Sequence, residues 1–304
     1  MSTRIPDTLK ADLPPSKWGK VLGATPVIMT VVATLLAGLS NGEMTKAQYA
    51  RALAAQQQSK AGDQWAFFQA KRLRSAIQSG TLDVLQFTDD VRPVDGEALR
   101  AFAAELPNAA AAQHALTFLV SARLPDAAPP TPPDPAMRAV LEAIESGLPD
   151  TELIPRLNAA KPELVSFALN TARAEVLAFD ERLQSVIADG DRLGAAIEAS
   201  GSASLRRDFA RLRLNYSTMR YDAEAGLNRA VANLLEIQVR QSNLTAERHH
   251  RRSQRFFYGL LAAQTAVIIA TFAIAARQRN LLWSLAAAAG LGAITFAAYV
   301  FLYL

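Results

Sequence analysis

Three histidines are the residues of this chain best suited to acid–base or metal chemistry. His249 and His250 are adjacent, so on a helix their side chains point about 100° apart and do not readily hold one metal ion. Glu247 and His250 have the three-residue spacing of a ligand pair, but arginines at 248, 251, 252 and 255 make a cation site electrostatically unfavourable. His114 stands alone in an alanine-rich segment, where we expect a structural role.

The other side chains that enzymes use form no recognisable set. The chain has no cysteine, which removes disulfides, thiolate metal sites and cysteine nucleophiles. Asp180 with Glu181, and Asp189 with Asp191, are expected on solvent faces of helices, where carboxylates are common. There is no phosphate-binding glycine loop, and no Ser–His–Asp arrangement stands out. The sequence therefore predicts no catalytic, cofactor-binding or metal-ligating residue, and a protein that is not an enzyme.

The residues best suited to recognition lie in the stretch Gln57–Lys71. Trp65 and Phe68 share one helical face, so one interpretation is that they pack on a neighbouring helix. In the other interpretation, Asp63, Gln64 and Trp65, with Phe68 beside them, form a docking point for an unidentified protein partner.

Most of these residues depend on one long helix, predicted over Leu205–Ala276 because no proline interrupts it. Apolar or small residues recur there at spacings of three and four, the seam of a coiled coil. The seam residues are Leu205, Phe209, Leu212, Tyr216, Met219, Ala223, Ala230, Leu234, Ile237 and Leu244. The seam shifts at Ala223–Leu227, a stutter that locally unwinds a supercoil without ending the helix.

A second seam precedes this helix and predicts an antiparallel hairpin over residues 162–255. Its members are Val176, Phe179, Leu183, Val186, Gly190, Leu193 and Ile197. Because only the short turn Ser200–Ser204 separates the two seams, the helices should lie antiparallel, with Gly201 at the tip. Beside the seam of the long helix, Leu227, Val231 and Leu235 form a second apolar face, from which we expect a homo-oligomer.

Three apolar runs, residues 21–39, 256–276 and 281–304, contain no Asp, Glu, Lys, Arg or His and are predicted to cross a lipid bilayer. The absence of intramembrane ionisable residues argues against a pump or a proton-coupled transporter. The first run could instead be a signal peptide, whose apolar region usually has ~7 to 15 residues and ends in a small-x-small cleavage site, whereas this run has nineteen residues and ends in Ala37–Ser40. An uncleaved anchor is therefore favoured.

The net charge of +4 is concentrated at the ends of these runs. The basic pieces are the tail of residues 1–20, the segment Arg240–Arg255 and the loop Arg277–Arg279. This placement favours anionic headgroups over nucleic acid, and the residues expected to contact headgroups are Arg248, Arg251, Arg252 and Arg255. The positive-inside rule puts the N-terminus and the 277–279 loop in the cytoplasm and Asn41–Arg255 in the periplasm, although Arg248–Arg255 argue the other way.

The rest of the chain is predicted to be helical too. A membrane-proximal helix over residues 40–80 starts after a loose Ser40–Gly42 and ends at Gly80. A helical insertion at 81–161 follows; it contains short helices at 96–106, 109–123 and 135–146 and an extended proline-rich linker at 125–135, and prolines 155 and 162 interrupt the segment after them. The predicted fold is all-α, with three transmembrane helices and a long antiparallel coiled-coil stalk that carries this insertion.

At Ala61–Lys71, just after the first apolar run, the sequence resembles an uncharacterised family of bacterial membrane proteins, the domain of unknown function 4337. The likeness continues in Arg220–Ala225, in the His249-His250 pair and in Ala275–Trp283. Departures are Gly62, the Phe67-Phe68 pair and the long 81–161 insertion. The resemblance implies a multi-pass protein of the bacterial inner membrane, and it brings no activity because the family has none assigned.

Two functions are compatible with these observations. The preferred one is a membrane-anchored structural or interaction protein that presents a coiled-coil domain and self-associates. The alternative is a passive channel or a transporter accessory subunit built from oligomerised transmembrane helices. Such a pore needs a polar stripe, which only Gln264 with Thr265, or Thr25 with Thr30, could supply.

Overall fold

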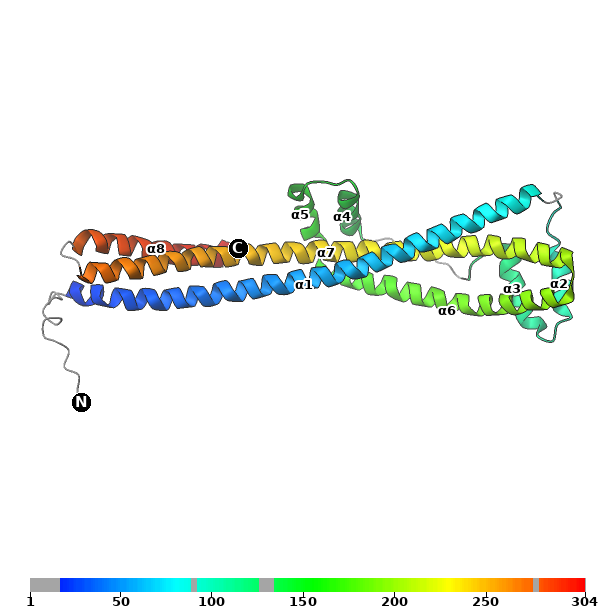
Figure 1. Ribbon diagram of the computed structural model, residues 1–304, viewed down its shortest axis with the longest axis horizontal. Coiled ribbons are helices and arrows are strands. Elements are labelled where there is room, and N and C mark those ends of the chain that lie inside the picture. The colour runs from blue at the N-terminus through cyan, green and yellow to red at the C-terminus, as the bar shows by residue number, and fades with distance from the viewer. Residues whose placement is uncertain (1–16, 89–91, 126–133, 276–278, 304) are drawn as a thin grey trace, which may run out of the picture. The chain divides into compact units, whose positions relative to one another are not determined.

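The computed structural model describes residues 17–88, 92–125, 134–275 and 279–303 of the 304-residue chain (Figure 1). Within these ranges the helix is the only regular secondary structure, so the predicted all-α class is confirmed there. The helices are α1 Lys17–Thr88, α2 Gly96–Ala104, α3 Ala109–Ser121, α4 Pro135–Glu145, α5 Asp150–Ala159, α6 Pro162–Ser200, α7 Ala203–Ala275 and α8 Arg279–Tyr303. Most of the predicted tail (1–20), most of the proline-rich linker (125–135) and part of the 277–280 connection lie outside the described residues.

The helix α1 continues through two points where the sequence analysis was wrong to expect an interruption, Ser40–Gly42 and Gly80. At the first point, the Ser40 hydroxyl donates to the carbonyl of Ser253 on α7 at 3.0 Å, and the Ser253 hydroxyl donates back to the Ser40 carbonyl at 2.9 Å. A helical glycine costs only about 1 kcal/mol relative to alanine, so packing of this kind outweighs it. Beyond Gly80, the helix continues to Thr88.

The chain forms two compact units, to which α1 and α7 both contribute. Unit 1 comprises Met1–Leu53 with Ser242–Leu304, and unit 2 comprises Ala54–Gln241. Within each unit α1 runs antiparallel to α7. The pairing joins Ser40 to Ser253 in unit 1 and Lys71 to Glu224 in unit 2.

In unit 2, α6 and α7 form an antiparallel hairpin that turns at Gly201 (Figure 1). Gly201 has a φ of +69°, in the left-handed region that favours glycine, and it ends α6. The hairpin core consists of Phe179, Leu183, Val186, Leu193 and Ile197 of α6 with Phe209, Tyr216 and Leu227 of α7. An added Cβ at Gly194 would lie 3.0 Å from the Phe209 ring, so the two helices approach closely there.

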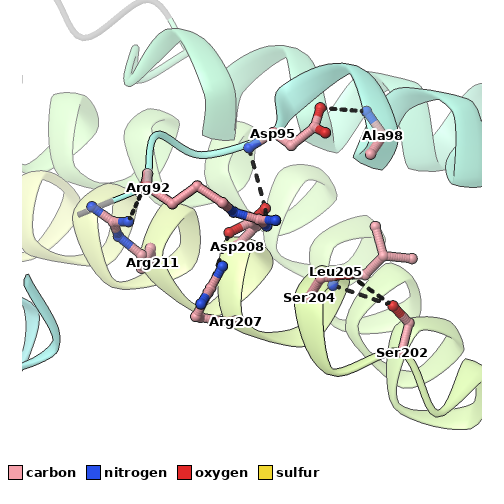
Figure 2. Close-up of polar contacts among 9 residues, drawn as sticks. All are labelled: Arg92, Asp95, Ala98, Ser202, Ser204, Leu205, Arg207, Asp208 and Arg211. Atoms are coloured by element: carbon pink, nitrogen blue, oxygen red, sulfur yellow. Dashed lines mark hydrogen bonds and ion pairs between the residues drawn. The ribbon is translucent and has the colours of Figure 1, made fainter. Parts of the chain in front are cut away.

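The short helices α2 and α3 extend this core near the turn. They contribute Leu99, Ala103, Ala112, Ala115, Leu116 and Leu119. The chain entering α2 is tied to α7 through Asp208, whose carboxylate accepts from the Arg92 guanidinium and from the Asp95 N–H (Figure 2). Asp95 then accepts from the Ala98 N–H at 2.9 Å and caps α2.

The helices α4 and α5 pack on each other, and Arg229 of α7 lies 3.2 Å from Glu145 at the end of α4. Pro155, which the sequence analysis treated as an interruption, lies inside α5, where a short helix loses one backbone hydrogen bond. Pro162 is the first residue of α6, a position where its missing N–H would have had no helical partner.

Unit 1 contains the apolar parts of α1, α7 and α8. Two helical stretches, within Ala24–Phe87 and within Ala203–Ala273, are long and apolar enough to cross a membrane, and α8 has a shorter apolar stretch, Ser284–Tyr299. Small side chains are buried here, including Ala33, Ala263, Ala266, Ala270, Ala273, Ala286 and Ala293. At Gly290 an added Cβ would lie 2.8 Å from the Met29 sulfur, so α1 and α8 are in close contact.

Candidate interaction groove

A groove of ≈ 700 Å³ lies in unit 2 between α1 and α6, with α7 at its base. Phe179, Leu227 and Val231 are buried and form an apolar floor. Phe67 of α1 and Leu177 of α6 form the walls and remain 54% and 70% exposed. Large apolar side chains left exposed on both sides of an apolar cleft are typical of a protein-binding surface.

The groove exists because α1 and α6 each pack on α7. Ala54 and Ala61 of α1 are buried, and the Ser75 hydroxyl donates to the Thr218 carbonyl at 3.3 Å. Small residues at these positions let α1 lie close to α7. Both helices therefore contact α7, and Phe67 and Leu177 face the space between them.

A polar relay connects the three helices nearer the start of α6. The Gln57 side chain of α1 donates to the Gln238 side chain of α7 at 3.4 Å, and Gln238 donates to the Ser166 hydroxyl of α6 at 3.3 Å. The relay therefore joins α1, α7 and α6 at one level of unit 2.

Charges line one end of the groove. Glu224 pairs with Lys71 of α1 and lies 3.4 Å from the Arg220 guanidinium. Burial raises the pKa of the nearby Asp180 carboxyl, and the negative charge of Glu224 raises it further, while Lys71 and Arg220 oppose the shift. Arg173 also lines the groove and is exposed. The groove therefore offers an apolar centre with both signs of charge around it.

The predicted docking residues are only partly gathered here. Gln64 lines the groove, whereas Asp63 is exposed on α1 outside it. Trp65 and Phe68 are half-buried and contact each other edge to face, with ring centroids 5.6 Å apart and planes at 83°. Phe67 and Leu177 were not among the residues predicted from the sequence. The sequence did contain a signal for both. Each is a large apolar residue that lies beside a residue of the packed helix face and outside the heptad pattern.

Leu227, Val231 and Leu235, predicted to face another copy of the chain, are 8%, 2% and 1% exposed within a single chain. The prediction of an oligomer from these three residues assumed that they lacked an intrachain neighbour. That assumption was wrong. The helix α7 has two apolar faces because it packs on two helices of its own chain, α1 and α6.

In unit 1, the predicted headgroup-contacting arginines divide into two groups. Arg248 and Arg251 are exposed, and Arg251 pairs with Glu247 at 2.9 Å. Arg252 and Arg255 are half-buried, and the Arg255 guanidinium lies 5.0 Å from the ring centroid of Tyr299 on α8.

The histidines found in the sequence have structural neighbours. His249 Nδ1 lies 2.7 Å from Glu43 Oε2 on α1, and the His250 ring contacts the Gln254 amide at 3.1 Å. His114 Nδ1 lies 3.2 Å from Asp189 Oδ2. Asp189 was expected on a solvent face, which was wrong, because α3 covers this part of α6. Among the described residues, no three His, Asp or Glu side chains form a metal-binding group.

The comparisons with known proteins agree with the N-terminal part of this description. Residues 18–116 match the model of the family described as domain of unknown function (DUF4337). This DUF4337 region is about a third of the chain and runs from the start of α1 into α3, so it includes Gln64, Phe67 and Lys71 of the groove. The C-terminal segments in which a likeness to the family was predicted from the sequence lie outside the matched residues. No curated protein and no solved structure matches the chain.

Proposed function

We propose that this chain is a membrane-anchored interaction protein, without catalytic chemistry, that presents the α1–α6 groove to a helix of a partner protein. The apolar helices of unit 1 would form a three-helix membrane anchor in the bacterial inner membrane. Residues 41–255 would lie on the periplasmic side and carry the groove. The exposed arginines Arg248 and Arg251 would contact anionic headgroups.

The observation that carries the proposal is the distribution of side-chain size in unit 1. Alanines fill the inside of the helix cluster, while large apolar side chains point outward. The exposed set includes Val27, Ile28, Val31, Leu35, Leu39, Leu261, Ile268, Phe272, Leu285, Leu291, Ile294 and Phe296. Water would penalise this surface by about 25 cal/mol per Å² of apolar area, whereas lipid would not.

The low burial of the apolar segments supports the same interpretation. Only 22% and 33% of the most apolar windows of α1 and α7 are buried. The core helix of a water-soluble protein would be mostly buried. The polar pair Ser40–Ser253 and the Arg255–Tyr299 contact border the apolar cluster, as expected for residues at a membrane–water interface.

Membrane integration is tested by extraction of membranes with alkaline carbonate. The full chain should stay in the pellet and be released only by detergent. Release into the carbonate supernatant would refute the anchor.

The groove is tested with a photo-crosslinking amino acid placed at Leu177 in the full chain in living cells. It should give a crosslink to another polypeptide, because Leu177 forms a groove wall. The matched control is the same amino acid at Gln58, exposed on α1 outside the groove. Equal crosslinking at both positions, or none at Leu177, would refute the docking role.

A passive channel remains the second candidate, because Thr30, Thr34 and Gln264 line one groove in unit 1. Images of detergent-extracted particles separate the two functions, since a ring of copies around a central pore would favour the channel.

A further inference from the structure

A second groove lies in unit 1, between the apolar segments of α1 and α7. It has a volume of ≈ 480 Å³. One wall consists of Thr30, Ala33, Thr34 and Ala37 of α1, and the other consists of Leu260, Gln264, Val267 and Ile268 of α7. If unit 1 is a membrane anchor, as proposed above, this groove opens towards lipid.

Gln264 is out of place on such a surface. Its side chain is exposed, and within the described ranges its amide has no hydrogen-bond partner. A carboxamide facing hydrocarbon without a partner is unfavourable, because lipid supplies neither a donor nor an acceptor. The opposite wall supplies acceptors only: Thr30 donates to the Pro26 carbonyl at 2.8 Å and Thr34 to the Thr30 carbonyl at 2.9 Å. Their hydroxyl oxygens still have lone pairs that can accept.

We infer that a second copy of this chain docks along this groove inside the membrane, with Gln264 of each copy hydrogen-bonded across a two-fold axis. A contact around a two-fold axis must be self-complementary. A carboxamide meets that condition because it both donates and accepts, so two copies of Gln264 satisfy each other. The hydroxyl oxygens of Thr30 and Thr34 add acceptors beside it.

The shape of the groove fits a neighbouring helix. Its α1 wall has only small side chains, and Gly38 continues the same face with no atom within 4 Å of an added Cβ. Small residues at such an interface let two membrane helices approach closely enough for van der Waals contact and interhelical hydrogen bonds. This dimer does not need Leu227, Val231 or Leu235, which are buried within one chain.

The test uses the full chain in detergent and in lipid nanodiscs. Native mass spectrometry should give twice the 32.8 kDa mass of one chain. Gln264→Leu should weaken the dimer about tenfold, because the two symmetry-related hydrogen bonds of the carboxamide pair are lost together. Thr295→Val, which removes a hydroxyl from an exposed position on α8, is the matched control and should leave the dimer unchanged.

A second measurement avoids any change to Gln264. Because the chain has no cysteine, Leu260→Cys introduces a single thiol beside the groove. Oxidation of native membranes should link two copies through Cys at this position, and Leu291→Cys on the lipid-facing side of α8 should not link them.

Four results would overturn the inference: a single chain at all concentrations, a Gln264→Leu variant that dimerises like the native chain, equal crosslinking at positions 260 and 291, or a ring of more than two copies. A monomer that still resists carbonate extraction would refute this dimer alone. Release by carbonate would refute the membrane anchor itself.

Discussion

Asp208 gives the sharpest test of how unit 2 is held together. Its carboxylate is 2% exposed, and Oδ2 accepts from Arg92 Nη2 at 2.9 Å and from the Asp95 N–H at 3.2 Å (Figure 2). Arg211 donates to the Arg92 carbonyl at 3.0 Å. One buried carboxylate on α7 thus fixes the chain that enters α2.

The structure allows the cost of two substitutions to be separated. Asp208→Asn keeps an oxygen that can accept from the Asp95 N–H but removes the charge that binds Arg92. Because the Arg92 side chain is 46% exposed, solvent can replace part of that interaction, and we expect a loss of about 1–2 kcal/mol of unfolding free energy. Asp208→Ala also leaves the Asp95 N–H without its acceptor, so we expect about 2–4 kcal/mol.

Two assays report these losses on the full chain. Denaturant unfolding in detergent gives the free energy, and hydrogen exchange of the α2 amides shows whether the loss is local, since α2 should exchange faster in both variants. Asp222→Asn is the matched control, because it breaks an exposed pair with Arg72 that is worth about 0–1 kcal/mol. Equal stability of Asp208→Asn and Asp222→Asn, with unchanged exchange in α2, would show that Asp208 does not anchor this segment.

Three further predictions follow from other parts of the chain. Gly201→Ala should lower the free energy of unfolding by about 1–2 kcal/mol, because the φ of Gly201 is +69°. Gly190→Ala is the control; its added Cβ has open space, so it should leave that free energy unchanged or raise it. Equal denaturant midpoints for the two variants would contradict the tight turn at Gly201. Burial raises the pKa of Glu43, but hydrogen bonds from Lys46 and His249 outweigh it and hold that pKa below the ordinary 4.5. The ionised Glu43 therefore stabilises the fold above pH 4.5, and this stabilisation is lost as the pH falls through the lowered pKa. The melting temperature of a Glu43→Gln variant should lack this acid-dependent loss. A pH profile of melting temperature identical to that of the native chain would refute this role of Glu43. With Ser202→Cys as the only thiol, a membrane-impermeant maleimide should label spheroplasts if residues 41–255 are periplasmic; protection until lysis would reverse the orientation.

The helices in which apolar residues recur at regular spacing could be predicted from the sequence. The long helix expected at Leu205–Ala276 is observed at Ala203–Ala275 because its period continues without proline and because Gly201 ends the preceding helix. The seam of α6 was also predictable, since every third or fourth residue is apolar or small and most of these residues are buried in the core that α6 shares with α7. Periodic patterns report the side of a helix that is buried.

Contacts between distant residues could not be predicted in the same way. Arg92 and Asp208 are 116 positions apart, and nothing in the spacing of charges singles out this pair. The helix boundaries predicted at Ser40–Gly42 and Gly80 were wrong for a related reason. The local preference of glycine for ending a helix is weak, and tertiary packing, which a single sequence does not show, outweighs it. The groove could not be predicted either, because its position depends on how α1 and α6 pack beside α7.

The second apolar face of α7 explains why a contact between copies was predicted at residues that a single chain already buries. Leu227, Val231 and Leu235 are large and contrast with their polar neighbours, so they stand out in a sequence. The face of α1 that lies along α7 is made of alanines such as Ala54 and Ala61, which bury little area each and give a weak signal. A helix with two strongly apolar faces can therefore bury both within its own chain. One face packs on a helix with large apolar side chains, and the other packs on a helix with alanines. The surface that we propose for another protein is then the gap between those two helices, where Phe67 and Leu177 remain exposed.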